Sequence, residues 1–214
     1  WHEVLPRWLT AGAFTRDELL PILHEHITTV VGRYRGQISA WDVVNEALGS
    51  DGAWRNTFWY KTIGPEYVDL AFRWAREADP QARPFYNDYG GEGMGRKSDA
   101  IYELVQGMRR RGVPIDGVGL QMHVRLDASP EPAEVAASLQ RLAALGLEVH
   151  ITEMDVRIQG PATEEKLTRQ ASIYRDMLRV CLAAENCGAF VFWGFTDRHS
   201  WIPRYFPGWG AALP

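Results

Sequence analysis

The sequence predicts an α/β protein in which a parallel sheet is covered by helices. Strand-like and helix-like segments alternate at intervals of about 35 residues, as in such sheets. The strand-like runs are continuously apolar, which is typical of strands covered on both faces. No linker or low-complexity stretch divides the 214 residues, so we expect a single domain over 1–214.

The individual elements follow from helix and strand signals. A helix is expected over 15–34, because Thr15 can cap it and apolar residues from Leu19 to Val31 recur at helical spacing. Further helices are expected at 65–78, 96–111, 131–144 and 163–185, mostly bounded by proline, glycine or threonine. Strands are expected at 38–44, 84–87, 117–122, 147–152 and 189–195, with a partial strand around residues 1–5.

Composition excludes some classes of function. The net charge of -4 and the pI of about 5.9 argue against nucleic acid as a partner, because no excess of basic side chains is present to neutralise phosphates. No apolar run approaches the roughly 20 residues of a membrane span. Cys181 and Cys187 are too few for a zinc site without a histidine cluster, and we expect no metal or cofactor. Their spacing fits a local disulfide or two buried thiols; we favour the disulfide, which implies an oxidising, extracytoplasmic setting.

Two glutamates close two of the predicted strands. Glu46 ends the run 41–46, and Glu153 ends the run 149–153. A carboxylate at the end of a buried strand is costly unless something uses it, and a lone one is more often a loop residue or a helix cap. Parallel strands present their C-terminal ends to the same edge of a sheet, so the two carboxylates can converge. A pair of this kind is what a glycosidase needs: one acid and one nucleophile.

Other polar and aromatic residues follow the same strand ends. Asn45 offers an amide to a sugar hydroxyl, and His123 can donate a hydrogen bond to Glu153, although a lone histidine is more often structural. Tyr86 and Gln121 end two other strands. Tryptophans flank these ends, and their flat apolar faces suit stacking on pyranose rings: Trp1, Trp193 and Trp201.

Five segments resemble glycoside hydrolase family 10, the endo-β-1,4-xylanases. WDVVNEA at 41–47 is similar to the acid/base motif of the family, and ITEMD at 151–155 is similar to its nucleophile motif. The other three follow in the order of the family: FYNDY at 85–89, GLQMH at 119–123, and FWG at 192–194 continuing to Ser200-Trp201. The resemblance covers essentially the whole chain.

The resemblance implies a (β/α)8 TIM barrel that hydrolyses xylan with retention of configuration. It implies Glu46 as the acid/base and Glu153 as the nucleophile, with a paired cysteine near Cys181 and Cys187. It places substrate-binding residues around the sugar: Trp1, Asn45, Tyr86, Gln121, His123, Trp193 and Trp201. We expect a secreted monomer whose partner is xylan or a xylo-oligosaccharide.

The sequence departs from the family near its ends. Val4 stands where the family usually has glutamine, and the first two strands and the last helix of the family have no counterpart in 1–214. We therefore expect an incomplete barrel with open edges, which alone folds poorly or is weakly active. Two other functions stay open: a related β-1,4-glycanase of the cellulase kind, and a carbohydrate-binding fragment that does not cut.

Overall fold

The computed structural model describes residues 4–214, which form two compact units. The first unit comprises residues up to Asp88 together with Asp99–Val118. The second comprises Tyr89–Ser98 together with Gly119–Pro214. Of the partial strand expected around residues 1–5, residues 1–3 lie outside the described part, and Val4 and Leu5 are not in a strand.

The sheet of the first unit is built on two parallel strands. β1 (Ala40–Asn45) pairs with β2 (Arg83–Asp88), with Ala40 opposite Arg83 and Asn45 opposite Asn87. The backbone N–H of Asp116 donates to the carbonyl of Pro84 at 3.0 Å, which leads into β3 (Gly117–Leu120). β3 runs from the first unit into the second.

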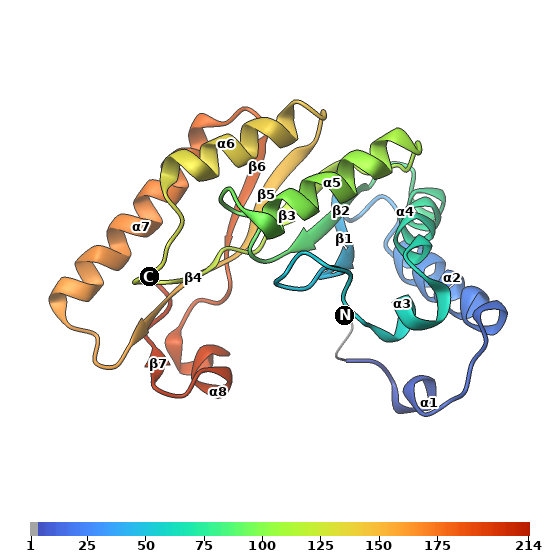
Figure 1. Ribbon diagram of the computed structural model, residues 1–214, viewed down its shortest axis with the longest axis horizontal. Helices are drawn as coiled ribbons and strands as arrows, with labels where there is room; N and C mark the ends of the chain where they lie inside the picture. The colour runs from blue at the N-terminus through green and yellow to red at the C-terminus, as the bar shows by residue number, and fades with distance from the viewer. Residues whose placement is uncertain (1–3) are drawn as a thin grey trace. The chain divides into compact units, whose positions relative to one another are not determined.

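The helices of the first unit are α1 (Arg7–Thr10), α2 (Arg16–Arg33), α3 (Phe58–Ile63), α4 (Glu66–Ala78) and α5 (Arg96–Arg110), whose first three residues belong to the second unit. α4 packs on β1 and β2, and α2 and α3 pack on α4 (Figure 1). Leu19 of α2 and Val68 and Phe72 of α4 are fully buried and form part of the core. The helix predicted at 15–34 is confirmed with its cap, because Thr15 accepts the N–H of Glu18 and Glu18 accepts the N–H of Thr15.

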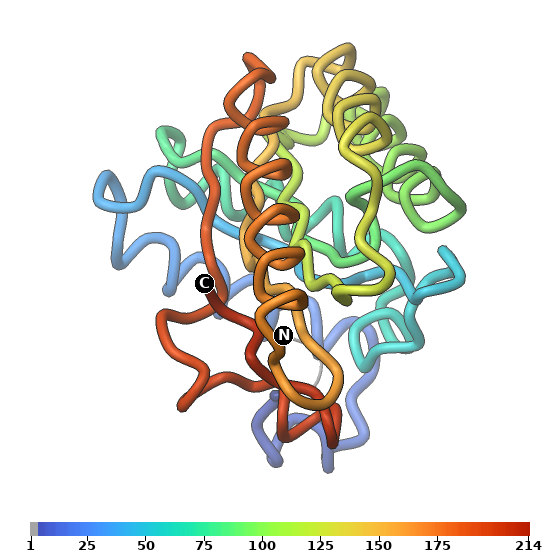
Figure 2. The backbone as a smooth tube through the Cα atoms, turned by 90° about the vertical axis from the view of Figure 1, so that its left-hand side faces the viewer, coloured from blue at the N-terminus to red at the C-terminus, as the bar shows by residue number. Residues whose placement is uncertain are grey.

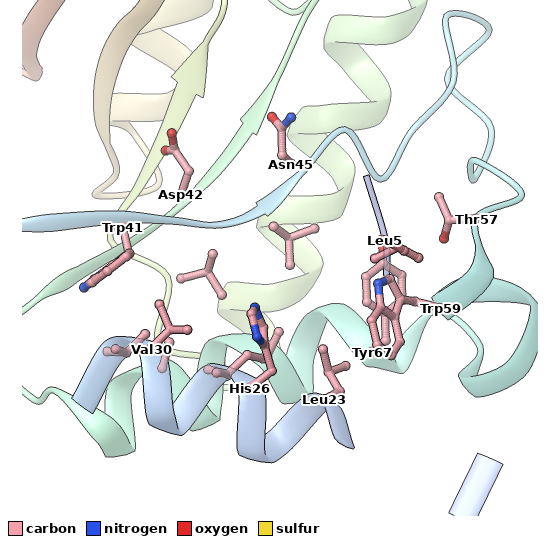
Figure 3. A pocket seen from close by; sticks show the side chains of 16 residues that line it. Leu5, Leu23, His26, Val30, Trp41, Asp42, Asn45, Thr57, Trp59 and Tyr67 are labelled. Atoms are coloured by element: carbon pink, nitrogen blue, oxygen red, sulfur yellow. The ribbon is translucent and has the colours of Figure 1, made fainter. Parts of the chain in front are cut away.

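A mainly apolar hollow of about 310 Å³ lies between α2 and β1 (Figure 3). Leu23, His26 and Val30 rise from α2 toward the strand, whereas the side chains of Asp42 and Asn45 project from the opposite side of β1 (Figure 3). The polar end of β1 is therefore directed away from the helix layer.

The second unit is organised around one long strand, β5 (Glu148–Gln159). β5 pairs in parallel with β4 (His123–Arg125) and β6 (Cys187–Phe192), and antiparallel with β7 (Trp209–Gly210). The helical segments are α6 (Pro132–Ala143), α7 (Glu164–Ala183), the short 3-10 helix Asp197–His199 and α8 (Ile202–Tyr205). α7 runs along β6 (Figure 2).

Two strand boundaries differ from prediction for identifiable reasons. β5 continues seven residues past the predicted end at Thr152, because Asp155 to Arg157 pair with β4 and Ile158 and Gln159 pair with β7. β3 stops at Leu120 instead of Met122, because Met122 takes a left-handed backbone with φ 64°. The short elements that were not predicted are α1, α3, α8, the 3-10 helix Asp197–His199, β4 and β7.

The expectation that all strands are covered on both faces is wrong for β6. The strand ends at Phe192 instead of Phe195, and Val191 and Phe192 are 45% and 41% exposed. β2 and β3 match the expectation, because nearly all their residues are buried.

The disulfide favoured from the sequence is confirmed. Cys181 near the end of α7 is bonded to Cys187 at the start of β6, with a Cα–Cα distance of 5.3 Å. The bond closes a short loop between these two elements. Among residues 4–214, the structure contains no helix that is both long enough and apolar enough to span a bilayer.

Candidate active site

Glu46 follows β1 directly and has a strained backbone. Its φ is 56°, in the left-handed region that residues other than glycine rarely adopt. The backbone N–H of Glu46 donates to the carbonyl of Asn87 at 2.9 Å, which fixes this turn to the end of β2. Such strain costs free energy and is found mainly at functional sites, so the observation marks Glu46 as a candidate.

Arg55 holds the segment that carries Glu46. Its Nε donates to the carbonyl of Glu46 at 2.9 Å, and its guanidinium lies 3.5 Å from the carboxylate of Glu46. The same guanidinium donates to the carbonyl of Leu48 at 3.4 Å, and the backbone N–H of Arg55 donates to the carbonyl of Ala47 at 2.8 Å. These contacts fix both the backbone and the carboxylate of Glu46. Sequence reasoning missed Arg55, because its role depends on how the loop after β1 folds back.

The ends of β1 and β2 are linked through side chains. The amide of Asn87 donates to the side-chain oxygen of Asn45 at 2.9 Å. The hydroxyl of Tyr86 donates to the carboxylate of Asp88, and both residues are fully buried. Burial, with the nearby charge of Asp88, raises the pKa of Tyr86 well above its usual value. Tyr86 therefore supports the sheet interior in this structure, and its contact with substrate stays a prediction.

In the second unit, Glu153 lies where β5 changes partners. The register against β6 shifts between Ile151 and Met154, and pairing with β4 begins at Asp155. The backbone N–H of Glu153 donates to the carbonyl of Gln121 at 3.1 Å. Glu153 is 9% exposed and Gln121 is 2% exposed. The prediction that Glu153 closes its strand is therefore wrong: Glu153 lies at the irregularity within β5.

His123 joins Glu153 to a second, buried carboxylate. Its Nε2 lies 3.2 Å from Oε2 of Glu153, and its Nδ1 lies 2.8 Å from Oδ2 of Asp155. Burial by itself lowers the pKa of His123, but the hydrogen bonds and charges of Asp155 and Glu153 raise it to about 9. A protonated imidazole donates to both carboxylates. The predicted contact between His123 and Glu153 is present in the structure.

Trp201 completes this network. Its indole Nε1 donates to the same Oδ2 of Asp155 at 2.8 Å, and its ring meets the ring of His123 edge-on at 4.8 Å between centroids. Asp155 is 1% exposed, so its carboxylate orients two neighbours from within the protein. Asp155 ends the ITEMD motif, but the sequence alone indicated no role for this residue. A carboxylate two residues after Glu153 in a strand shares its face, and this signal could have identified it.

Trp193 presents an apolar surface near His123. The two ring centroids are 6.4 Å apart, and Trp193 is 48% exposed. An exposed tryptophan ring is suited to stacking on a sugar, and this role of Trp193 stays a prediction. Trp1, the third tryptophan in that prediction, lies outside the described residues. Within residues 4–214, no group of three His, Cys, Asp or Glu side chains is arranged to hold a metal ion.

Comparison with known proteins identifies the family. The family model for glycosyl hydrolase family 10 matches residues 1–213. Endo-1,4-beta-xylanase B of Thermotoga neapolitana is 45% identical over the whole chain, which spans 62% of that protein. The endo-1,4-beta-xylanase of Agaricus bisporus is 42% identical, with 64% of its length covered.

Comparison with solved structures identifies the same family. Xylanase 10B from Thermotoga petrophila RKU-1 in complex with xylobiose is 45% identical, with a TM-score of 0.96; the whole of this chain matches 65% of that one. Native xylanase 10B from Thermotoga maritima is 46% identical, with a TM-score of 0.96 and 66% of its chain covered. The predicted fold class, the (β/α)8 barrel type of α/β protein, is confirmed. The chain belongs to glycosyl hydrolase family 10.

Proposed function

We propose that the protein containing this chain is an endo-1,4-β-xylanase that hydrolyses internal bonds of xylan with retention of configuration. The observation that carries the proposal is the hydrogen-bonded series Glu153–His123–Asp155, in which a cationic imidazole stands beside a carboxylate. A nucleophilic carboxylate must stay ionised, and an adjacent cationic donor favours that state. The relatives that share the whole chain are named endo-1,4-beta-xylanases, which supports xylan as the substrate.

The proposed reaction has two displacements. In the first, an oxygen of Glu153 bonds to the anomeric carbon while Glu46 gives its proton to the departing glycosidic oxygen. In the second, Glu46 takes a proton from water, the water oxygen bonds to the anomeric carbon, and the bond to Glu153 breaks. Each step inverts the anomeric centre, so the product retains its configuration.

Retaining enzymes hold these two carboxyl groups about 5 to 5.5 Å apart. In this chain Glu46 belongs to the first compact unit and Glu153 to the second. Arg55 fixes the acid/base segment within its unit, and His123 fixes the nucleophile within the other. We assign Asn45, Gln121, Trp193 and Trp201 to the surroundings of the sugar on the basis of the family pattern.

The proposal includes the location of the protein outside the cell. The disulfide Cys181–Cys187 favours an oxidising, extracellular location, because such bonds rarely persist in the cytosol. A single catalytic domain and a monomeric state remain predictions.

Substrate and mechanism are tested together. Reducing-sugar release from xylan should greatly exceed release from carboxymethylcellulose; the reverse preference would favour the cellulase-like alternative.

Glu153→Ala should abolish turnover of an aryl xylobioside, and added azide should restore it while forming the glycosyl azide of inverted configuration. Binding of xylo-oligosaccharides without any hydrolysis by the unmodified protein would favour the non-catalytic alternative. Loss of activity without azide rescue would contradict Glu153 as the nucleophile.

A further inference from the structure

Glu92 is a buried acid that the proposed reaction does not use. It belongs to the segment Tyr89–Ser98 of the second unit and is 7% exposed. One oxygen of its carboxylate accepts the backbone N–H of Met122 at 2.8 Å and that of Gly90 at 3.2 Å. Burial raises the pKa of Glu92, although hydrogen bonds from backbone N–H groups act in the opposite direction.

Met122, the residue that Glu92 contacts, has an unusual backbone. Its φ is 64°, and the residue is fully buried between Gln121 and His123. On one side this segment is tied to β5, because the N–H of Asp155 donates to the carbonyl of Met122 at 3.4 Å. The N–H of Met122 is satisfied by the carboxylate of Glu92. A buried N–H in a rarely adopted conformation needs such an acceptor.

The segment that carries Glu92 is itself fixed. The carbonyl of Gly91 accepts hydrogen bonds from the hydroxyls of Ser98 at 3.1 Å and Ser138 at 3.2 Å, and both serines are buried. The single hydroxyl proton of Ser98 is shared with the carbonyl of Gly93, which lies 2.6 Å from the hydroxyl oxygen. The backbone on both sides of Glu92 is thereby attached to α5 and α6, so its carboxylate is presented from a rigid support.

We propose that Glu92 is a positioning residue for the nucleophile: its carboxylate holds Met122 in the left-handed conformation and so sets where the imidazole of His123 meets Glu153 and Asp155. The chain turns at Met122, and the next residue places its two ring nitrogens on these two carboxylates. A different φ at Met122 would carry the imidazole away from one or both of them. The inference rests on the proposed function only in naming Glu153 as the nucleophile.

Three variants separate an acceptor role from a charge effect. Glu92→Gln removes the negative charge but keeps an oxygen for the N–H of Met122, whereas Glu92→Ala removes both. Glu92→Asp keeps the charge on a side chain one methylene shorter, and it replaces the alanine variant if that variant does not fold. Glu185→Ala is the control, because Glu185 is an exposed glutamate of the same unit.

The first readout is the titration of His123, followed by NMR of its ring protons; this measurement needs no substrate. The carboxylates facing this imidazole are those of Asp155, Glu153 and Glu92. The titration midpoint should fall by about one pH unit or more in Glu92→Ala or Glu92→Asp, because the hydrogen bonds of His123 are lost. It should stay close to that of the unmodified protein in Glu92→Gln and in Glu185→Ala.

The second readout is kcat/KM on an aryl xylobioside. It should fall about tenfold to 100-fold in Glu92→Ala through kcat, with KM little changed, and Glu92→Gln should recover most of the loss.

If Glu92→Gln matched Glu92→Ala in both readouts, the charge and not the acceptor would matter, and the proposal would be wrong. An unchanged His123 titration in Glu92→Ala would equally overturn it. If the titration shifted as expected but the unmodified protein cleaved no xyloside, the proposed function would fail and the role of Glu92 in placing His123 would stand.

Discussion

The charge on His123 makes a quantitative prediction about stability and pH. In the folded protein its pKa is about 9, against 6.5 for an unperturbed histidine. The folded state therefore holds a proton that the unfolded chain releases at lower pH. This contribution to the free energy of unfolding is fully present below about pH 6.5 and is lost as the pH rises through about 9.

The size of the effect follows from the same two values. The difference between about 9 and 6.5, at about 1.36 kcal/mol for each pKa unit, corresponds to about 3 kcal/mol. The side chain is 12% exposed, so solvent screens this contribution little. Between about pH 6.5 and pH 9, the free energy of unfolding should fall by about 1.4 kcal/mol for each pH unit because of this one group.

Urea unfolding at several pH values, in the unmodified protein and in His123→Gln, measures the effect. The difference in free energy of unfolding between the two proteins should shrink by about 3 kcal/mol from pH 6 to pH 9.5, because other titrating groups are common to both. Asp155→Asn, which leaves His123 without the carboxylate at Nδ1, should show an intermediate dependence. Parallel curves for the unmodified protein and His123→Gln would show that His123 does not hold an additional proton in the folded state.

Three further perturbations address the first unit and the disulfide. Glu46→Ala should spare the first step on aryl xylosides with good leaving groups and slow it about 100-fold or more on poor ones, since only the latter need a proton; equal slowing on both would contradict Glu46 as the acid. Arg55→Ala should lower kcat on xylan about tenfold to 100-fold by releasing the Glu46 segment, and an unchanged kcat would exclude that role. Replacing Cys181 and Cys187 by serine should lower the free energy of unfolding by about 2 kcal/mol in urea titrations, and no loss would show that the short loop is not constrained.

Much of the helical structure could be predicted from local signals. The cap at Thr15 is a pattern of nearby residues, and the structure forms the reciprocal bonds between Thr15 and Glu18 that this pattern indicates. Thr163 likewise caps α7 by accepting the N–H of Lys166. These contacts span three residues, so the sequence contains all the information that determines them.

The strand boundaries could not be predicted in the same way, because distant partners decide them. β5 extends to Gln159 because its last two residues pair with Trp209 and Gly210 of β7, about 50 residues later in the chain. The left-handed backbones at Glu46 and Met122 have no local signal either, because glycine is the residue expected there. Each is fixed by a partner far along the chain, Asn87 for Glu46 and Glu92 for Met122.

Some candidate residues of the site could be identified from the sequence, whereas those that depend on distant partners could not. Glu46, Glu153 and His123 follow strand-like runs and could be identified as candidates from that position alone. Arg55 and Glu92 act on backbone groups that only the folded chain brings near them, and so neither was recognised. Their side chains are typical of surface residues in sequence, and their partial or nearly complete burial is a property of the tertiary structure.

In the proposed reaction, Glu153 carries the sugar between the two displacements. The direct measurement is to trap this intermediate with a fluorine-substituted aryl xylobioside, digest the protein and locate the labelled peptide by mass spectrometry. We expect the sugar on the carboxylate of Glu153, with activity returning when an acceptor sugar removes it. A label on any other residue, or full turnover with no covalent species, would exclude Glu153 as the nucleophile.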